Sequence, residues 1–424
     1  MFGYENHFCR EESPARMTTV TPKRPPRRVR WLFIAATLCF WCSMYTYVPI
    51  LSPYLEHIDF SYARIGIVLG SYGFMQLAVR FPLGLWSDRL GRRKPFVLAG
   101  FAASALGCLM FLAFQDPVGV TAARAMTGIA ASAWVAFTVL YASWFPAQEA
   151  TKAMGVLSFA TGAGQLAGMG VSGFLADAWG FAATFRTGLL AALLGGAIAL
   201  FVREDRPAPQ SASRSPMRTA DLVAVTRDAT LVKASGLSVL AHAVLFVTMF
   251  GFTPSYAVKI GAGETELSLL VFAFMIPHTA ASWLSALCIA PRLGEWRTVL
   301  AGFLLSGLCT AAIPFIPDIP LLYATQAVNG FAQGMHLPLL LGLAIRNIGQ
   351  AKRATAMGFY QAVYALGMFS GPFAAGWLND AFGLAGGFAF AAVAAFAAAG
   401  IILYGSPDRS ARRAVRAGGK ERAL

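Results

Sequence analysis

The sequence has few charged residues and places no acidic residue deep within any of its long apolar runs. Charged residues make up 13% of the 424 residues, whereas soluble domains usually carry about 25%. Hydrophobic residues reach 57%, and the mean hydropathy is +0.59. This composition excludes an ordinary soluble domain and indicates a chain that lies mostly in lipid.

Cysteine is also scarce, and the six cysteines show no spacing typical of a disulfide framework. Cys39 and Cys42 share one helix face within an apolar run, but no further cysteine or histidine lies beside them, so we interpret them as packing residues rather than a metal pair. The sequence predicts no metal and no cofactor. It also shows no nucleophile or paired carboxylates near one membrane face, which argues against a membrane-embedded enzyme.

Twelve apolar runs are present, each long enough to span a bilayer, which takes about 20 residues. Backbone amides in lipid must be satisfied within their own segment, so these runs are expected to be helices. The sequence therefore predicts an all-α membrane protein with twelve transmembrane helices. The runs cover residues 31–52, 63–84, 95–115, 118–145, 151–176, 181–202, 231–256, 266–290, 298–316, 319–345, 353–378 and 383–404.

The net charge of +14 is distributed unevenly along the chain, in a pattern that follows membrane topology. Basic residues collect in the two tails, in the stretch 203–230 and in alternate loops, which indicates membrane orientation rather than a nucleic-acid surface. The positive-inside rule then predicts a multi-pass protein of the inner (plasma) membrane with both termini cytoplasmic. The intervening loops hold mostly acids, namely Glu56, Asp59, Asp116, Asp177, Glu264, Glu266, Asp318 and Asp380.

Five regions follow from this pattern. The first apolar run is too long for a signal-peptide core and no small-residue cleavage site follows it, so we expect a retained helix after a basic tail. The Arg/Pro/Ser-rich stretch in the middle is the natural domain boundary. The predicted regions are the cytoplasmic tail 1–30, a six-helix bundle 31–202, a cytoplasmic linker 203–230, a second six-helix bundle 231–404 and the tail 405–424.

The two predicted bundles are related by an internal repeat. At an offset of 203 residues, Gly164, Gly168 and Gly173 match Gly367, Gly371 and Gly376. Earlier in the halves, Pro49 matches Pro254. Two parallel halves imply a pseudo-two-fold axis along the membrane normal with a central site between them. Glycine at a spacing of four lets helices approach closely in lipid.

The loop after the second run reads Gly-Leu-Trp-Ser-Asp-Arg-Leu-Gly-Arg-Arg-Lys over residues 84–94, which we call the gate loop. It resembles the signature between helices two and three of the major facilitator superfamily. Arg124 followed by Gly128 resembles the second motif of that family. The resemblance implies the superfamily fold, alternating access and secondary transport, with a gate in which the Asp rests against the eleventh helix. It assigns that gate to Gly84, Asp88, Arg89, Gly91, Arg92 and Arg93.

Two departures from the family pattern bear on function. Efflux members carry Gly-Pro in helix five, where this chain has Gly168-Met169; that weakens an antiporter interpretation without excluding it. In the second half, Pro291 stands where the first half has Asp88. We therefore expect the first half to carry the gate chemistry.

Polar residues within the apolar runs mark the candidate substrate cavity, because such residues are costly in lipid. In the run 319–345, Gln326, Asn329, Gln333 and His336 recur at helical spacing and predict a polar stripe facing a cavity. An alternative interpretation of Arg80 is that its side chain extends its charge to the membrane interface. The alternative for His242 and His278 is that they are histidines packed in the core. The remaining predicted cavity residues are Tyr45, Gln76, Arg80, Arg124, Trp134, Gln165, His242 and Gln361.

These residues predict a secondary transporter of a small organic solute, with a proton as the coupling ion. With no deep carboxylate, coupling would have to use a histidine, and His336 is the candidate; Arg124 would attract an anionic or polar substrate group. Uptake of an anionic or zwitterionic metabolite and efflux of drugs or metabolites by proton antiport both remain open, as does uniport. We expect a monomer in the bilayer whose partners are substrate, proton and lipid, with no nucleic acid.

Overall fold

The computed structural model describes residues 25–145, 150–204, 227–348 and 353–404, and within these ranges it is almost entirely helical, with no strand. The helices of the first half are α1 (Arg27–Tyr45), α2 (Val48–His57), α3 (Tyr62–Leu90), α4 (Lys94–Ala113), α5 (Pro117–Ser132), α6 (Trp134–Ala142), α7 (Ala150–Trp179) and α8 (Phe181–Leu200). Those of the second half are α10 (Ala229–Val247), the π-helix η3 (Thr248–Phe252), α11 (Thr253–Lys259), α12 (Glu264–Leu284), the π-helix η4 (Ser285–Ile289), α13 (Ala290–Leu293), α14 (Glu295–Ala312), the 3₁₀ turn η5 (Ile313–Phe315), α15 (Ile319–Ile345), α16 (Arg353–Phe382) and α17 (Leu384–Tyr404).

These elements form twelve spans and confirm the predicted fold class. Nine stretches of the described residues are long and apolar enough to cross a membrane. The other three spans are α3, α7 and α16, with 29, 30 and 30 residues. Several helices run past the predicted ends because polar residues stop an apolar run without stopping a helix: the first span continues through Glu56 to His57.

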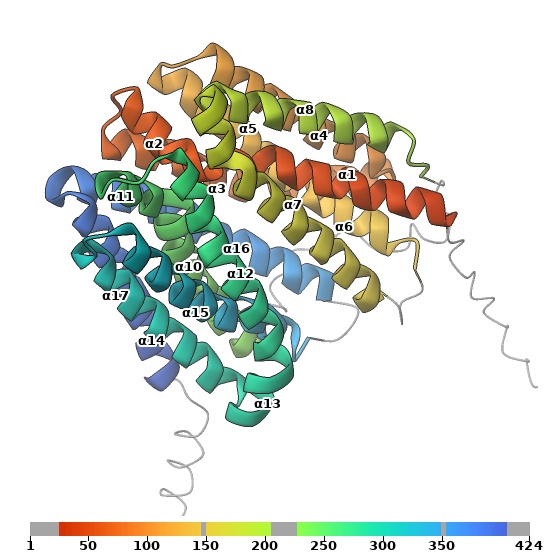
Figure 1. The fold of residues 1–424 in the computed structure, drawn as a ribbon. Coiled ribbons are helices and arrows are strands. Elements are labelled where there is room, and N and C mark those ends of the chain that lie inside the picture. The colour runs from red at the N-terminus through yellow and green to blue at the C-terminus, as the bar shows by residue number, and fades with distance from the viewer. Residues whose placement is uncertain (1–24, 146–149, 205–226, 349–352, 405–424) are drawn as a thin grey trace, which may run out of the picture.

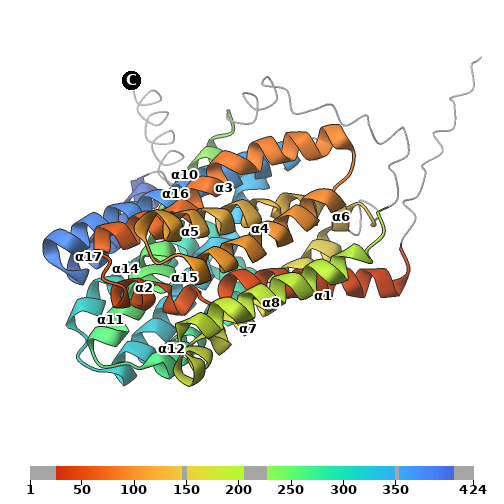
Figure 2. The same ribbon diagram turned by 90° about the horizontal axis from the view of Figure 1, so that it is seen from above.

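The repeat is visible in the turns and in the helix packing. Gly180 and Gly383 have φ of 76° and 68°, and Gly91 and Gly294 have φ of 62° and 87°, so both pairs, each 203 residues apart, use the same left-handed turn. Within the halves, α3 packs on α5 as α12 packs on α15, and α1 packs on α7 as α10 packs on α16. Figures 1 and 2 show the first half, red to yellow-green, beside the second, green to blue.

The halves meet along two helix pairs, α3 with α16 and α7 with α12. We call the bundle end that carries the gate loop and residues 203–230 the linker end, and the end with the acid-rich loops the acidic end. Near the acidic end the contacts are very close. A Cβ added to Gly66 would lie 2.4 Å from the Pro372 carbonyl oxygen, and one added to Gly173 would lie 1.7 Å from the Glu264 carbonyl oxygen.

The same helix faces diverge from the second half towards the linker end. Gly84 lies 18 residues after Gly66 and Gly155 lies 18 residues before Gly173, which is about five full helical turns in each case, so each pair shares a face. A Cβ at Gly84 or Gly155 would meet no atom within 4 Å. The halves are therefore closed together at the acidic end and spread apart at the linker end.

The first spans of the two halves are broken at equivalent places. α1 ends at Tyr45 and α2 begins at Val48, just before Pro49, while α10 passes through η3 before Pro254. The break in the second half leaves the Gly251 carbonyl free to accept a hydrogen bond of 2.8 Å from the Ser52 hydroxyl of α2. This bond joins the two halves at the acidic end.

Candidate functional site

A cluster of polar and aromatic side chains lies where the two halves meet, on the linker side of the close glycine contacts. We call it the central cluster. It draws on both halves, which is where the repeat places a shared site. Its members are Tyr45 from α1, Tyr72, Gln76 and Arg80 from α3, Arg124 from α5, His242 from α10, and Tyr364 from α16.

Arg80 joins the halves within this cluster. Its Nη1 donates to the Tyr364 hydroxyl at 3.0 Å, and its Nη2 donates to the Gln76 side-chain oxygen at 2.5 Å. Gln76 Nε2 lies 3.7 Å from the Met368 sulfur of α16. The guanidinium is 7% exposed, so its charge is held inside the bundle by neutral partners rather than by a carboxylate.

Arg124 lies deeper and has fewer partners. It is 3% exposed, and its Nε and Nη1 have no hydrogen-bond partner. The guanidinium carbon sits 4.4 Å from the centre of the Tyr72 ring, a cation–π contact. The cluster therefore holds two guanidinium groups, that of Arg124 over the Tyr72 ring and that of Arg80 over the Tyr364 ring.

Aromatic rings surround this pair of charges. Phe246 of α10 lies nearly parallel to Tyr72, with ring centres 6.0 Å apart, and Phe250 of η3 meets Tyr45 edge-on at 5.7 Å. Tyr45 also neighbours Tyr72. An aromatic enclosure excludes water and strengthens the attraction of a buried cation for an anion.

The polar stripe of α15 lies elsewhere, against α14 inside the second half. The Ser306 hydroxyl of α14 donates to Asn329 Oδ1 at 2.8 Å, and Gln333 Nε2 and Gln326 Oε1 make longer contacts of 3.4 Å with Asn329. The His336 ring stacks on Phe303 of α14 with centres 4.3 Å apart. All four stripe residues are buried, and these contacts join them to α14 and to one another.

The other predicted cavity residues lie on α6, α7, α10 and α16. Gln165, His242 and Gln361 are half-buried. Trp134 is also half-buried and packs edge-on against Trp41 at 5.3 Å, as part of an aromatic core of the first half. The structure thus brings together Tyr45, Gln76, Arg80, Arg124 and His242, and adds Tyr72 and Tyr364.

The gate loop is bound by Glu204, a residue outside the predicted gate residues. The two Glu204 carboxylate oxygens accept from the backbone N–H groups of Arg93 and Lys94 at 2.6 and 2.9 Å, which caps the start of α4. Arg93 also donates to the Ser87 hydroxyl at 2.5 Å. Arg89 and Arg92 are exposed, and the side chain of Asp88 lies outside the described residues. The sequence did contain a signal for Glu204: it is an acidic residue that directly follows a span at the otherwise basic end of the bundle.

Replacing Glu204 should weaken this clamp. We expect Glu204→Ala to lower the free energy of unfolding by about 1–2 kcal/mol, the usual cost of losing a cap, and Glu204→Gln, which keeps one acceptor oxygen, to cost less. Thermal unfolding of the purified protein in detergent measures both. Equal stability of the wild type and the alanine variant would contradict the clamp.

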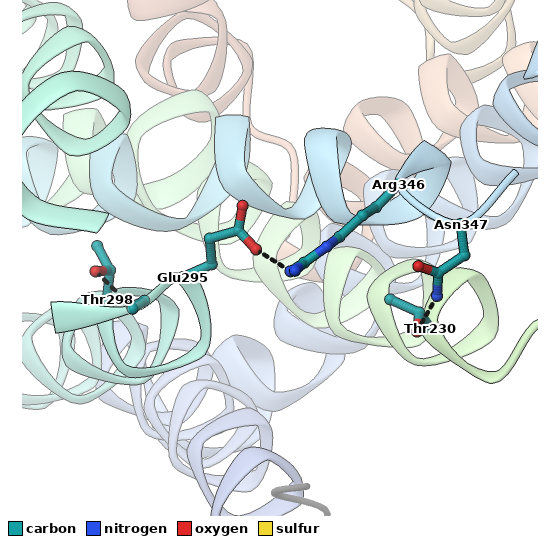
Figure 3. A network of polar contacts seen from close by, with 6 residues as sticks. Thr230, Glu295, Thr298, Arg346 and Asn347 are labelled. Atoms are coloured by element: carbon teal, nitrogen blue, oxygen red, sulfur yellow. Dashed lines mark hydrogen bonds and ion pairs between the residues drawn. The ribbon is translucent and has the colours of Figure 1, made fainter. Parts of the chain in front are cut away.

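The second half closes its linker end with a different network (Figure 3). Arg346 at the end of α15 donates to Glu295 at the start of α14 at 2.5 Å, and Asn347 donates to the Thr230 hydroxyl of α10 at 3.0 Å. The ion pair is 60% and 41% exposed at its two side chains, so it contributes little stability. The two linker-end loops have thus diverged in chemistry while keeping the shared glycine turn.

Comparison with known proteins identifies the family to which the chain belongs. The sequence matches the Major Facilitator Superfamily over residues 33–258 and 234–424. The uncharacterized transporter YceJ of Bacillus subtilis is 24% identical over 84% of this chain and 92% of its own length. The rat synaptic vesicular amine transporter is 25% identical over 76% of this chain and 62% of its own. The crystal structure of the nucleoside transporter NupG superposes with a TM-score of 0.74 at 15% identity, covering 89% of this chain and 98% of that one. The chain is therefore a multi-pass membrane protein that belongs to the Major Facilitator Superfamily of transporters.

Proposed function

We propose that the protein is a secondary transporter that moves a small organic solute carrying an anionic group, by alternating access between the two halves. The observation that carries this proposal is Arg124. A guanidinium that is 3% exposed, with two nitrogens lacking partners, is costly unless a negative group neutralises it. Carboxylates or phosphates match the planar donors of arginine best.

The acids of the chain support the same conclusion. Acidic residues within the spans stand near helix ends, as Glu56, Asp177 and Asp380 do. Among the described residues of the spans, no acid stands at the depth of Arg124, so the anion that pairs with it should come from the solute. Cations would meet two buried positive charges and be repelled.

The finer assignments are part of the proposal. A proton gradient drives transport. The protein is a monomer in the plasma membrane, and both of its termini face the cytoplasm. The linker end, where the two halves are spread apart, opens to the cytoplasm. Efflux by proton antiport is the second candidate. A putative sugar efflux transporter of Deinococcus radiodurans, 25% identical over 82% of this chain and 90% of its own length, favours the direction of efflux.

Reconstitution tests the substrate class. Purified protein in liposomes with an imposed pH gradient is offered radiolabelled benzoate and lactate as anions, leucine and betaine as zwitterions, and choline and tetraphenylphosphonium as cations. We expect movement of at least one solute that carries a carboxylate, and none of the cations. Transport confined to the cations would overturn the proposal, and reversing the gradient distinguishes uptake from efflux.

A further inference from the structure

The two helix pairs that join the halves differ in how far their contact extends. Between α3 and α16 the contact begins at the acidic end and continues along both helices. A Cβ added to Gly73 of α3 would lie 2.5 Å from the Met368 carbonyl carbon of α16. Two turns further along α3, Arg80 donates its hydrogen bond to Tyr364. The contact on this side therefore reaches the central cluster.

Between α7 and α12 the contact ends earlier. A Cβ added to Gly170 would lie 2.5 Å from the Phe272 ring of α12, but one added to Gly162 would meet no atom of the described residues within 4 Å. The repeat fixes the depth of this position, because Tyr364 is equivalent to Thr161 at the offset of 203 residues, and an axis along the membrane normal preserves depth. At the depth of the central cluster the halves are thus joined on one side and parted on the other.

Two large aromatic rings mark the parted side. Phe159 of α7 lies eleven residues before Gly170 and is 78% exposed, while Trp283 of α12 lies eleven residues after Phe272 and is 66% exposed. Eleven residues make about three full turns, so each ring shares the helix face that makes the last contact. The helices run in opposite directions, so both rings lie equally far beyond that contact, where a closed pair would bury them. We call the space between them the side gap; its borders are Phe159, Gly162, Thr279 and Trp283.

A proline explains why the helices part on this side. α12 contains Pro277, which follows Phe272 and precedes the side gap. A proline inside a helix removes a backbone hydrogen bond and bends the helix. α3, the equivalent helix of the first half, has its internal proline, Pro82, only after Arg80. The contact of α3 with α16 therefore continues where that of α12 with α7 ends.

The side gap faces the bilayer. Beside the line of contact, Ala167 and Phe174 of α7 and Leu269 of α12 are exposed within their spans, so these two helices lie at the surface of the bundle and meet lipid. A space between two such helices opens to the lipid. Its aromatic borders are apolar, so a hydrocarbon chain can pass from the bilayer into the gap without entering water.

The interior end of the gap has the opposite character. At the same depth the central cluster holds the guanidinium groups of Arg80 and Arg124, which are 7% and 3% exposed. A molecule that satisfies both ends needs an apolar chain for the gap and an acidic head for the arginines. A short hydrophilic anion would satisfy only the second requirement.

We propose that the solute is an amphipathic anion whose hydrocarbon chain enters through the side gap from the lipid leaflet at the linker end, while its acidic head binds Arg80 and Arg124. The proposal rests on the proposed function, because it narrows the anionic solute of that transporter to one class. Single-chain carboxylates, sulfonates and phosphates share this chemistry. Of the anions offered to the reconstituted protein above, benzoate comes nearer to it than lactate.

Photolabelling tests where the chain lies. The full-length protein in liposomes is illuminated with a long-chain alkylsulfonate that carries a diazirine in the middle of its chain, and the labelled residues are mapped by mass spectrometry. A sulfonate stays ionised, so the probe keeps its charge in the membrane. We expect labels at Phe159 and Trp283 to fall at least about tenfold in Arg124→Gln, the lower end for loss of charge-assisted hydrogen bonds. Labels at Phe174 and Leu269, which are exposed to bulk lipid, should not change.

A substitution in the gap itself provides the second measurement. Gly162→Trp fills the space from α7 and should reduce labelling at Trp283 in the same way. Ala167→Trp is the matched control, because Ala167 is exposed on the lipid side of the same helix; it should leave the labelling unchanged. If Gly162→Trp does not fold, Thr279→Trp narrows the gap from α12, where Thr279 is also exposed.

Two results would overturn the proposal. Labelling at Phe159 and Trp283 that Arg124→Gln leaves unchanged would mean that bulk lipid alone occupies the gap. Equal labelling in Gly162→Trp and Ala167→Trp would mean that the chain does not pass between α7 and α12. Either result, combined with loss of benzoate transport in Arg124→Gln, would leave the proposed function standing.

Discussion

Arg124→Gln should strongly reduce transport of the carboxylate solute while leaving the protein at least as stable as the wild type. Loss of charge-assisted hydrogen bonds worth about 1.5–3 kcal/mol corresponds to a fall of about 10- to 150-fold in the specific rate. Removal of an unpaired buried charge is expected to stabilise the fold by about 1–4 kcal/mol. Glutamine is a conservative choice because the repeat places Gln326 at the equivalent position of the second half.

The two measurements are uptake by proteoliposomes and thermal unfolding of the same preparation. Arg186→Gln is the matched control, because Arg186 of α8 also lies within a span but is exposed; it should change neither quantity much. Arg124→Lys keeps the charge without the planar donors and should fall between wild type and glutamine. A stable Arg124→Gln protein with unchanged transport would remove Arg124 from the substrate site.

Gly173→Ala should open the acidic end. The new methyl group would lie 1.7 Å from the Glu264 carbonyl oxygen, which is far inside van der Waals contact, so α7 and α12 must separate. Overpacking of this kind costs about 1–3 kcal/mol, which shifts the closed-to-open ratio by roughly 5- to 150-fold. The backbone N–H of Gly173 would also lose the hydrogen bond of 2.8 Å that it donates to the Ser268 hydroxyl oxygen.

Labelling of a buried reporter measures this shift. Ser255 on α11 is 2% exposed near the acidic end, and Ser255→Cys in a cysteine-free background should react with a maleimide far faster when Gly173 is replaced. Gly155→Ala is the control, because Gly155 shares the same face of α7 but meets no atom within 4 Å; it should not raise the labelling rate. Equal rates in the two glycine variants would show that the acidic end is not held by this contact.

Much of the fold could be predicted from the sequence because the membrane imposes a strong pattern. A span must be apolar over about 20 residues, and that requirement alone located all twelve helices. The helix ends were less predictable, since α3 and α16 continue for several residues through polar sequence at the bundle ends. The π-helices η3 and η4 had no sequence signal. A π-helix differs from an α-helix in which carbonyl oxygen each backbone N–H bonds to, and no residue type marks that difference.

The candidate site was predictable only in part. Helical spacing indicated which residues of one helix share a face, and so grouped Gln76 with Arg80 and Gln326 with His336. Spacing does not say which neighbour that face meets. The stripe of α15 meets Ser306 and Phe303 of α14, which lie in the same half, and the role of His336 and its companions therefore stays a prediction for experiment.

The π-helix η3 has a further consequence for how the halves are aligned. A π turn holds an additional residue compared with an α turn. Deleting one residue within Thr248–Phe252 would restore regular α-helix between α10 and α11. The Gly251 carbonyl would then take its ordinary place in the helix and no longer face Ser52. A hydrogen bond that joins the two halves at the acidic end thus depends on the wide turn of one five-residue segment.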